Sequence, residues 1–205
     1  NYNTDRFSAF AVESVTFGKN MVEAGLRFDI ETNDVRGREI NQDIFRDNYT
    51  FINFTGSLGY VRQLSENSTF RTNIGTAWRT PNMEELYSFG QHGFKTTFGL
   101  LRFTDTNGKL STDEVIPINQ STVHPERGYK FINEFQTHKN GNSHNLTVYS
   151  HYIENYVFDR PIGVFGTIRG PMPAFIFDQV DALFFGADYR WKKNWTDKIS
   201  SVFGA

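Results

Sequence analysis

Hydrophobic and polar side chains alternate without interruption over residues 22–31. Every even-numbered residue in this stretch is apolar, and the odd-numbered residues are two glutamates, an arginine, an aspartate and a glycine. Successive side chains of a β-strand point to opposite faces, so the segment has one apolar face and one charged face. Similar alternation returns in residues 54–60, 70–79 and 183–191. The pattern predicts a sheet of amphipathic strands.

These strands are long enough to cross a membrane. We expect them at about 7–17, 21–33, 48–62, 68–79, 128–139, 143–158 and 179–192, with another beginning near 198. A strand of about 11–13 residues rises roughly 40 Å, and at a tilt of about 45° it spans a hydrocarbon core near 30 Å. No apolar run approaches the roughly 18 residues of a membrane helix.

The connections between the expected strands alternate in length. Short, turn-rich connections fall at 18–20, 65–67, 140–142 and 193–197, and long ones at 34–47, 80–127 and 159–178. Outer-membrane barrels have short periplasmic turns and long extracellular loops. The sequence therefore predicts an all-β fold: an antiparallel transmembrane β-barrel, here a meander of about 7–8 strands from a larger barrel, with each strand paired to its sequence neighbour.

The alternation also predicts which side chains face lipid and which face the lumen. The lipid-facing set is Leu26, Phe28, Leu58, Tyr60, Leu183 and Phe185. The lumen-facing set is Arg27, Asp29, Arg71, Asp188 and Arg190.

Composition adds few constraints. The 205 residues carry a net charge of -2, which gives no reason to expect nucleic acid as a partner. The chain has no cysteine, and so no disulfide framework, thiolate nucleophile or Cys-based zinc site. Aromatic residues reach 16%, which suits strands and the aromatic girdles of barrels. No signal peptide precedes Asn1 and a strand begins near the last residue, so we expect a mature fragment of a larger protein.

One segment carries a family resemblance. It reads Trp78-Arg79-Thr80-Pro81-Asn82-Met83-Glu84-Glu85-Leu86-Tyr87, followed by Gly90-Gln91-His92-Gly93. This run resembles the barrel domain of TonB-dependent outer-membrane receptors. Three further stretches fit the same family: Pro125-Glu126 opening a strand with Glu134, Gly25-Leu26-Arg27-Phe28-Asp29, and Phe185-Gly186-Ala187-Asp188.

The resemblance implies a barrel of about 22 strands, a size at which the lumen is plugged. Residues 1–205 would be a partial barrel domain, because no segment matches the plug domain or its TonB box. The implied function is TonB-dependent uptake of a ferric siderophore or haem across the outer membrane of a Gram-negative bacterium, without enzymatic activity or a resident cofactor. The implied partners are outer-membrane lipid, the plug and remaining strands of the same receptor, and the TonB complex.

Candidate ligand-binding residues lie in the 80–127 segment. His92 stands beside Gly90 and Gly93, and its imidazole is a ligand for iron. Tyr87, Gln91 and His124 are further candidates, although a solvated loop histidine is the alternative for both His92 and His124. Neither histidine has a second ligand at metal-site spacing, so we expect no structural metal site.

Four charged residues are candidates for a plug- or lumen-facing role. Arg71 and Arg79 can form bidentate pairs with plug carboxylates, or attract an anionic chelate. Glu84 and Glu85 are adjacent, so their side chains diverge, which favours a solvated or plug-facing role over a catalytic carboxylate pair.

Two alternative functions remain open from the sequence. A small outer-membrane barrel enzyme would need a catalytic set at the rim, and no Gly-x-Ser-x-Gly motif is present. A soluble aromatic-rich β-sandwich acting as a binding module would not place its long connections at one end.

Overall fold

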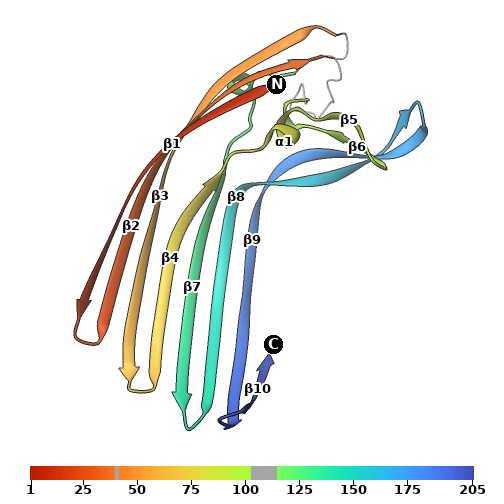
Figure 1. The fold of residues 1–205 in the computed structure, drawn as a ribbon. Coiled ribbons are helices and arrows are strands. Elements are labelled where there is room, and N and C mark those ends of the chain that lie inside the picture. The colour runs from red at the N-terminus through yellow and green to blue at the C-terminus, as the bar shows by residue number, and fades with distance from the viewer. Residues whose placement is uncertain (40–41, 103–114) are drawn as a thin grey trace.

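The computed structural model describes residues 1–39, 42–102 and 115–205, and the side chain of His92 lies outside this description. Seven long strands and the short strand β10 follow the predicted order (Figure 1). They are β1 (Tyr2–Phe17), β2 (Asn20–Arg38), β3 (Ile44–Ser65), β4 (Ser68–Arg79), β7 (Glu126–Lys139), β8 (Asn142–Thr167), β9 (Gly170–Thr196) and β10 (Ile199–Gly204). Between β4 and β7 lie α1 (Met83–Tyr87), β5 (Phe89–His92), β6 (Lys95–Phe98) and the 3₁₀ turns η1 (Leu100–Arg102) and η2 (Ile118–Gln120).

The ten strands of the described residues form one curved sheet (Figure 1). Neighbours in the order β1-β2-β3-β4-β7-β8-β9-β10 pair antiparallel, which confirms the predicted meander and excludes two packed sheets in this part of the chain. The prediction that each strand pairs antiparallel with its sequence neighbour was wrong in the longest connection, between β4 and β7. There, β5 and β6 form a hairpin, and β6 pairs parallel to β9 from Thr96–Ala174 to Phe98–Ile176.

Two of the three predicted long connections are mostly strand. The β2–β3 hairpin continues to Arg38–Ile44, and the β8–β9 hairpin continues to Thr167–Gly170, where Ile168 and Arg169 form the turn. Pro171 and Pro173 lie in β9, within the range that the sequence assigned to a long connection. Both prolines come before Ala174, the first residue of β9 that pairs with β6. The edge of β9 that faces away from β8 is therefore unpaired at the prolines, and their missing N–H groups cost no ladder hydrogen bond there.

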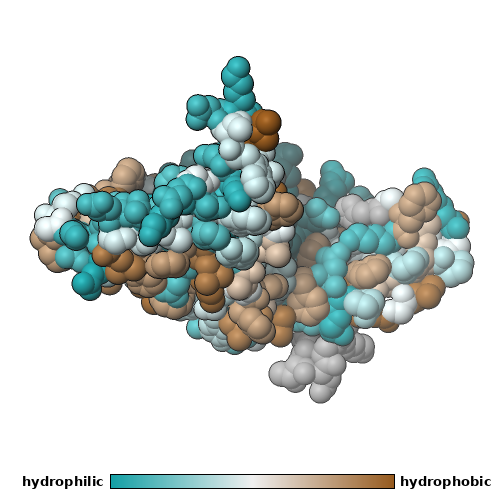
Figure 2. Space-filling model, turned by 90° about the horizontal axis from the view of Figure 1, so that it is seen from below, coloured by the Kyte–Doolittle hydropathy of each residue, from teal (hydrophilic) through white to brown (hydrophobic). Residues whose placement is uncertain are grey.

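The sheet separates apolar from charged side chains. The predicted lipid-facing residues Leu26, Leu58, Leu183 and Phe185 are all exposed, and the Phe28 and Phe54 rings meet across β2 and β3 at 4.7 Å. On the opposite face Asp29 accepts hydrogen bonds from Arg27 and from Ser8 on β1. Viewed from below, hydrophilic residues follow one side of the sheet and hydrophobic residues the other (Figure 2). No helix of the described residues has the length and apolarity needed to span a membrane.

Candidate functional site at the loop end of the sheet

The β4–β7 connection, residues 80–125, lies at the loop end of the sheet, opposite the short turns at 18–19, 66–67, 140–141 and 197–198. It begins where β4 leaves β3: their ladder ends at Ser57–Gly75, whereas β4 stays paired with β7 up to Arg79–Glu126. The Trp78 indole N–H then donates to Asp29 (3.1 Å), and the Thr80 hydroxyl donates to Glu31 (2.8 Å). Because both acceptors belong to β2, the end of β4 crosses the charged face of β3.

Trp78 shows what this crossing changes. Strict alternation assigns its side chain to the same face as Ile74, yet its indole reaches Asp29 on the charged face. The Arg6 guanidinium also lies over the Trp78 ring, 5.6 Å from its centroid. The β3–β4 ladder ends before this residue, so β4 is free to twist there and the two-residue period no longer fixes the face.

Arg79 joins four elements at the base of the connection. It pairs with Glu85 of α1 (2.7 Å) and with Glu126 of β7 (2.5 Å), and Glu126 accepts the Val157 N–H of β8 (2.8 Å). The hydrogen bond to Glu126 is the main cause that raises the pKa of Arg79 above its usual value. Glu85 also completes a capping box with Asn82 at the start of α1. Two of the predicted charged residues, Arg79 and Glu85, are therefore in direct contact.

Tyr87 anchors α1 to the β2–β3 hairpin. Its hydroxyl donates to Asp47 (2.9 Å), which also accepts the Ile118 N–H (3.1 Å), and its ring stacks on Phe45 at 5.5 Å. Burial raises the pKa of Tyr87, and the neighbouring Asp47 raises it further. Beside it, Leu86 is 0% exposed and packs in a core with Val35, Tyr49, Leu101 and Ile118.

The β5–β6 hairpin fastens the connection to the β8–β9 hairpin. Its parallel ladder with β9 is backed by a buried cluster of Phe98, Ala174 and Ile176, and Lys95 pairs with Asp159 (2.5 Å). Gln91 donates to the Gly93 carbonyl (2.9 Å), and His92 is the last residue of β5. The hairpin turns at Gly93, which has a φ of 62°, and presents Phe94, which is 94% exposed.

The site also contains a buried ion pair that the sequence did not predict. Arg102 and Glu39 are 4% and 8% exposed and meet at 2.8 Å, while Glu39 also accepts the Val115 N–H at 2.8 Å. The Arg102 guanidinium lies over the Phe89 ring, 5.2 Å from its centroid. Nothing in the local sequence marks this pair, because its partners are 63 residues apart.

The other predicted residues lie apart from this core. His124 is exposed, and its backbone exchanges hydrogen bonds with the Gln179 amide (3.2 and 2.7 Å). Glu84 is exposed, and Arg71 contacts Glu134 (3.4 Å) and Gln136 (3.2 Å) of β7. No described contact joins His124 to Tyr87 or Gln91. The described residues contain no group of three or more His, Cys, Asp or Glu side chains placed to hold a metal ion.

Comparison with known proteins identifies the fold family. The family model "TonB dependent receptor-like, beta-barrel" matches residues 1–200. Similar solved structures include the copper transporter OprC (14% identity, 98% of this chain and 29% of that chain, TM-score 0.67). A Serratia marcescens hemophore receptor HasR, a double mutant in complex with HasA and heme, matches at 13% identity (93% and 32%, TM-score 0.68). The FrpB iron transporter from Neisseria meningitidis matches at 11% (100% and 25%, TM-score 0.60).

These likenesses establish the fold, and this chain spans less than a third of each of the three solved chains. A search of the curated proteins found no match.

Proposed function

Because the chain belongs to the TonB-dependent receptor-like β-barrel family, we propose that residues 1–205 form part of the barrel wall and outer mouth of an iron-chelate receptor. The cargo is a ferric siderophore or haem, taken up across the outer membrane of a Gram-negative bacterium. The plug and the remaining strands belong to the same receptor, and the TonB complex drives transport through them. The family and the similar structures are receptors and transporters, which favours transport over the enzyme alternative.

The observation that carries this proposal is the folded β4–β7 connection. It is attached to the β2–β3 hairpin through Tyr87–Asp47 and Arg102–Glu39, and to the β8–β9 hairpin through Lys95–Asp159. A connection held at both sides gives the loop end a defined shape instead of a set of independent loops. A preformed surface of this kind binds a ligand with less loss of conformational entropy.

Within this surface, the β5–β6 tip is the proposed contact for cargo. It brings Gln91, His92 and the exposed ring of Phe94 into one short hairpin, so an iron ligand and an aromatic surface are neighbours in sequence. Tyr87 supports the site by packing α1 against β3, and His124 contributes a weaker contact from the far end of the connection.

The charged residues below this surface are proposed to meet the plug. Arg71 is the strongest candidate, since its guanidinium is about half exposed beside Glu134. Arg79 and Glu85 already satisfy one another, so we assign them to shaping the connection above the plug. Glu84 remains exposed and available for a plug contact.

The test is equilibrium binding to the purified intact receptor, with a panel of ferric siderophores, haem and Cu²⁺ as probes. His92→Ala is expected to weaken binding of the preferred iron chelate roughly ten- to a hundredfold, as expected for loss of a buried ligand contact. His124→Ala, the matched histidine control, is expected to have a smaller effect. An unchanged dissociation constant for His92→Ala removes that residue from the site. A receptor that binds neither siderophores nor haem contradicts the proposed cargo.

A further inference from the structure

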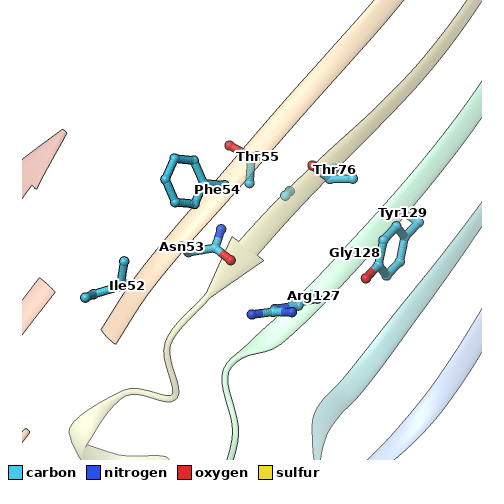
Figure 3. A pocket seen from close by; sticks show the side chains of 9 residues that line it. Ile52, Asn53, Phe54, Thr55, Thr76, Arg127, Gly128 and Tyr129 are labelled. Atoms are coloured by element: carbon cyan, nitrogen blue, oxygen red, sulfur yellow. The ribbon is translucent and has the colours of Figure 1, made fainter. Parts of the chain in front are cut away.

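The seam between β3 and β4 opens into a pocket. At its closed end Thr76 takes the place of the backbone ladder: its Oγ1 accepts the Gly56 N–H (2.9 Å) and donates to the Gly56 carbonyl (3.3 Å). Above this point β4 moves toward the charged face, and a cavity of about 300 Å³ lies between β3, β4 and β7 (Figure 3).

Two hydrogen-bond donors at this pocket have no partner in the described part of the chain. Asn53 is 6% exposed, and its Nδ2 amide group makes no hydrogen bond. Arg127 is exposed and forms no ion pair, although Glu154 is its cross-strand neighbour on β8. In Figure 3 the Asn53 and Arg127 side chains extend toward one another across the end of β4. A buried amide without an acceptor and a nearby free guanidinium together favour a ligand with anionic oxygens.

The pocket lies at the outer boundary of the membrane. A tilted strand crosses the hydrocarbon in about 9–11 residues. Counted from the short turns, this length ends near Phe54 on β3 and near Tyr129 on β7. At this level the Tyr129 and Tyr152 rings stack at 6.2 Å, while their hydroxyls donate to Glu154 and Asp181. Tyrosines with an apolar body and a hydrogen-bonded tip are typical of the aromatic girdle at the lipid headgroups.

The remaining lining suits an acyl chain. Phe54 and Ile52 are exposed apolar side chains of β3 and, with Tyr129 of β7, line the pocket. The seam thus combines donors for an anion with apolar surface at the height of the headgroups. Glu154, the cross-strand neighbour of Arg127, accepts the Tyr129 hydroxyl (3.3 Å).

From this combination we propose that the β3–β4 seam binds the phosphate-bearing headgroup, of net negative charge, of an outer-leaflet lipid. Arg127 donates to the headgroup oxygens. The Asn53 amide, which lies on the charged face opposite Asp29, donates to them through the open seam, and an acyl chain of the same lipid lies along Phe54 on the apolar face. The site is separate from the cargo surface on the β5–β6 hairpin, so its occupancy does not depend on which chelate the receptor transports.

The experiment is native mass spectrometry of the intact receptor in detergent, titrated with phosphatidylglycerol, phosphatidylcholine or inorganic phosphate. Wild-type receptor is expected to retain phosphatidylglycerol in preference to phosphatidylcholine. Arg127→Gln is expected to weaken the first phosphatidylglycerol site roughly tenfold, since a charge-assisted hydrogen bond is lost. Arg190→Gln, at an exposed arginine of β9, is the matched control and is expected to leave that affinity unchanged. Asn53→Ala tests the second donor, and the mobility of unheated samples on SDS gels verifies that each barrel is folded.

Three outcomes would overturn the proposal. The first is equal affinity for the two lipids, which would show that the anionic headgroup is not recognised. The second is an Arg127→Gln receptor that binds phosphatidylglycerol as the Arg190→Gln receptor does. The third is inorganic phosphate binding as tightly as phosphatidylglycerol, which would make the seam a free-anion site without a role for the acyl chain.

Discussion

Truncation of Leu86 to alanine is expected to release the β4–β7 connection while leaving the barrel wall intact. Leu86 is fully buried among Val35, Tyr49, Leu101 and Ile118, so the core joins the connection to the β2–β3 hairpin. The substitution removes three carbon atoms, worth about 0.8 kcal/mol each in transfer free energy. With the cavity left behind, the docked connection loses about 3–4 kcal/mol, inside the range of about 2–5 kcal/mol for such changes.

Amide hydrogen exchange measures this loss locally. Good reporters are the N–H groups of Ser88, Gly99 and Ile118, which donate to Glu84, Ser88 and Asp47 respectively. A loss of about 3 kcal/mol raises the population of the undocked connection roughly a hundredfold, so these amides are expected to exchange faster by up to that factor. Amides of the β7–β8 ladder, which the connection does not support, are expected to keep their protection.

Phe94→Ala is the matched control, because Phe94 belongs to the same connection but is 94% exposed. Its reporter amides are expected to exchange at the wild-type rate. The reasoning is refuted if Leu86→Ala leaves the three reporters protected, or if the β7–β8 amides lose protection to the same extent.

Three further changes test other parts of the molecule. Leu26 lies on the apolar face, six residues after Asn20, and Leu26→Lys is expected to lower the free energy of unfolding by urea in lipid vesicles by about 2–4 kcal/mol. Glu23→Lys, on the opposite face, is expected to lower it little. Equal losses for the two variants would contradict the assigned faces. Glu39→Gln leaves the Arg102 guanidinium buried without an anion, so limited proteolysis is expected to cut the connection faster by a factor corresponding to about 3–5 kcal/mol. Adding Arg102→Met removes the unpaired charge and is expected to slow cleavage again. If the double variant is cleaved as fast as Glu39→Gln alone, an unpaired charge is not the cause. Burial raises the pKa of Tyr49 to about 12. Because this folded-state pKa lies above the unfolded value of about 10, the contribution of neutral Tyr49 to docking of the connection is complete below about pH 10 and is lost as the pH rises toward 12. Tyrosinate absorbance measures the titration, and a result in which every tyrosine titrates near pH 10 would disprove this prediction.

The sequence predicted the barrel wall well because its signal is local. A two-residue period needs only neighbouring residues, and the turns at 18–19, 66–67 and 140–141 are marked by their own glycine and asparagine residues. The period failed at Trp78, where β4 loses its β3 partner. It also understated β8 and β9, which continue through most of residues 159–178, the range expected to be a long connection.

The candidate site was less predictable because long-range contacts build it. Glu39 and Arg102, or Lys95 and Asp159, are 63 and 64 residues apart, and nothing near either member of a pair indicates the other. The segment that carries the family resemblance contains α1 and its capping box. Tyr87 was predicted to bind ligand, and in the structure its hydroxyl donates to Asp47. Whether His92 and His124 contact cargo stays a prediction.

The ion pair between Arg79 and Glu126 closes the base of the β4–β7 connection, where the two strands are still in register. The chain leaves β4 after Arg79 and enters β7 at Glu126, at paired positions of the same ladder. The segment is therefore a cassette: another sequence of different length, joined at the same two residues, keeps the register of every membrane strand. The carboxylates of Glu39, Asp47 and Asp159, which the present segment covers, lie at the water-exposed end of the sheet and would simply be solvated. Exchange of this one segment can therefore change the outer mouth while the barrel strands stay the same.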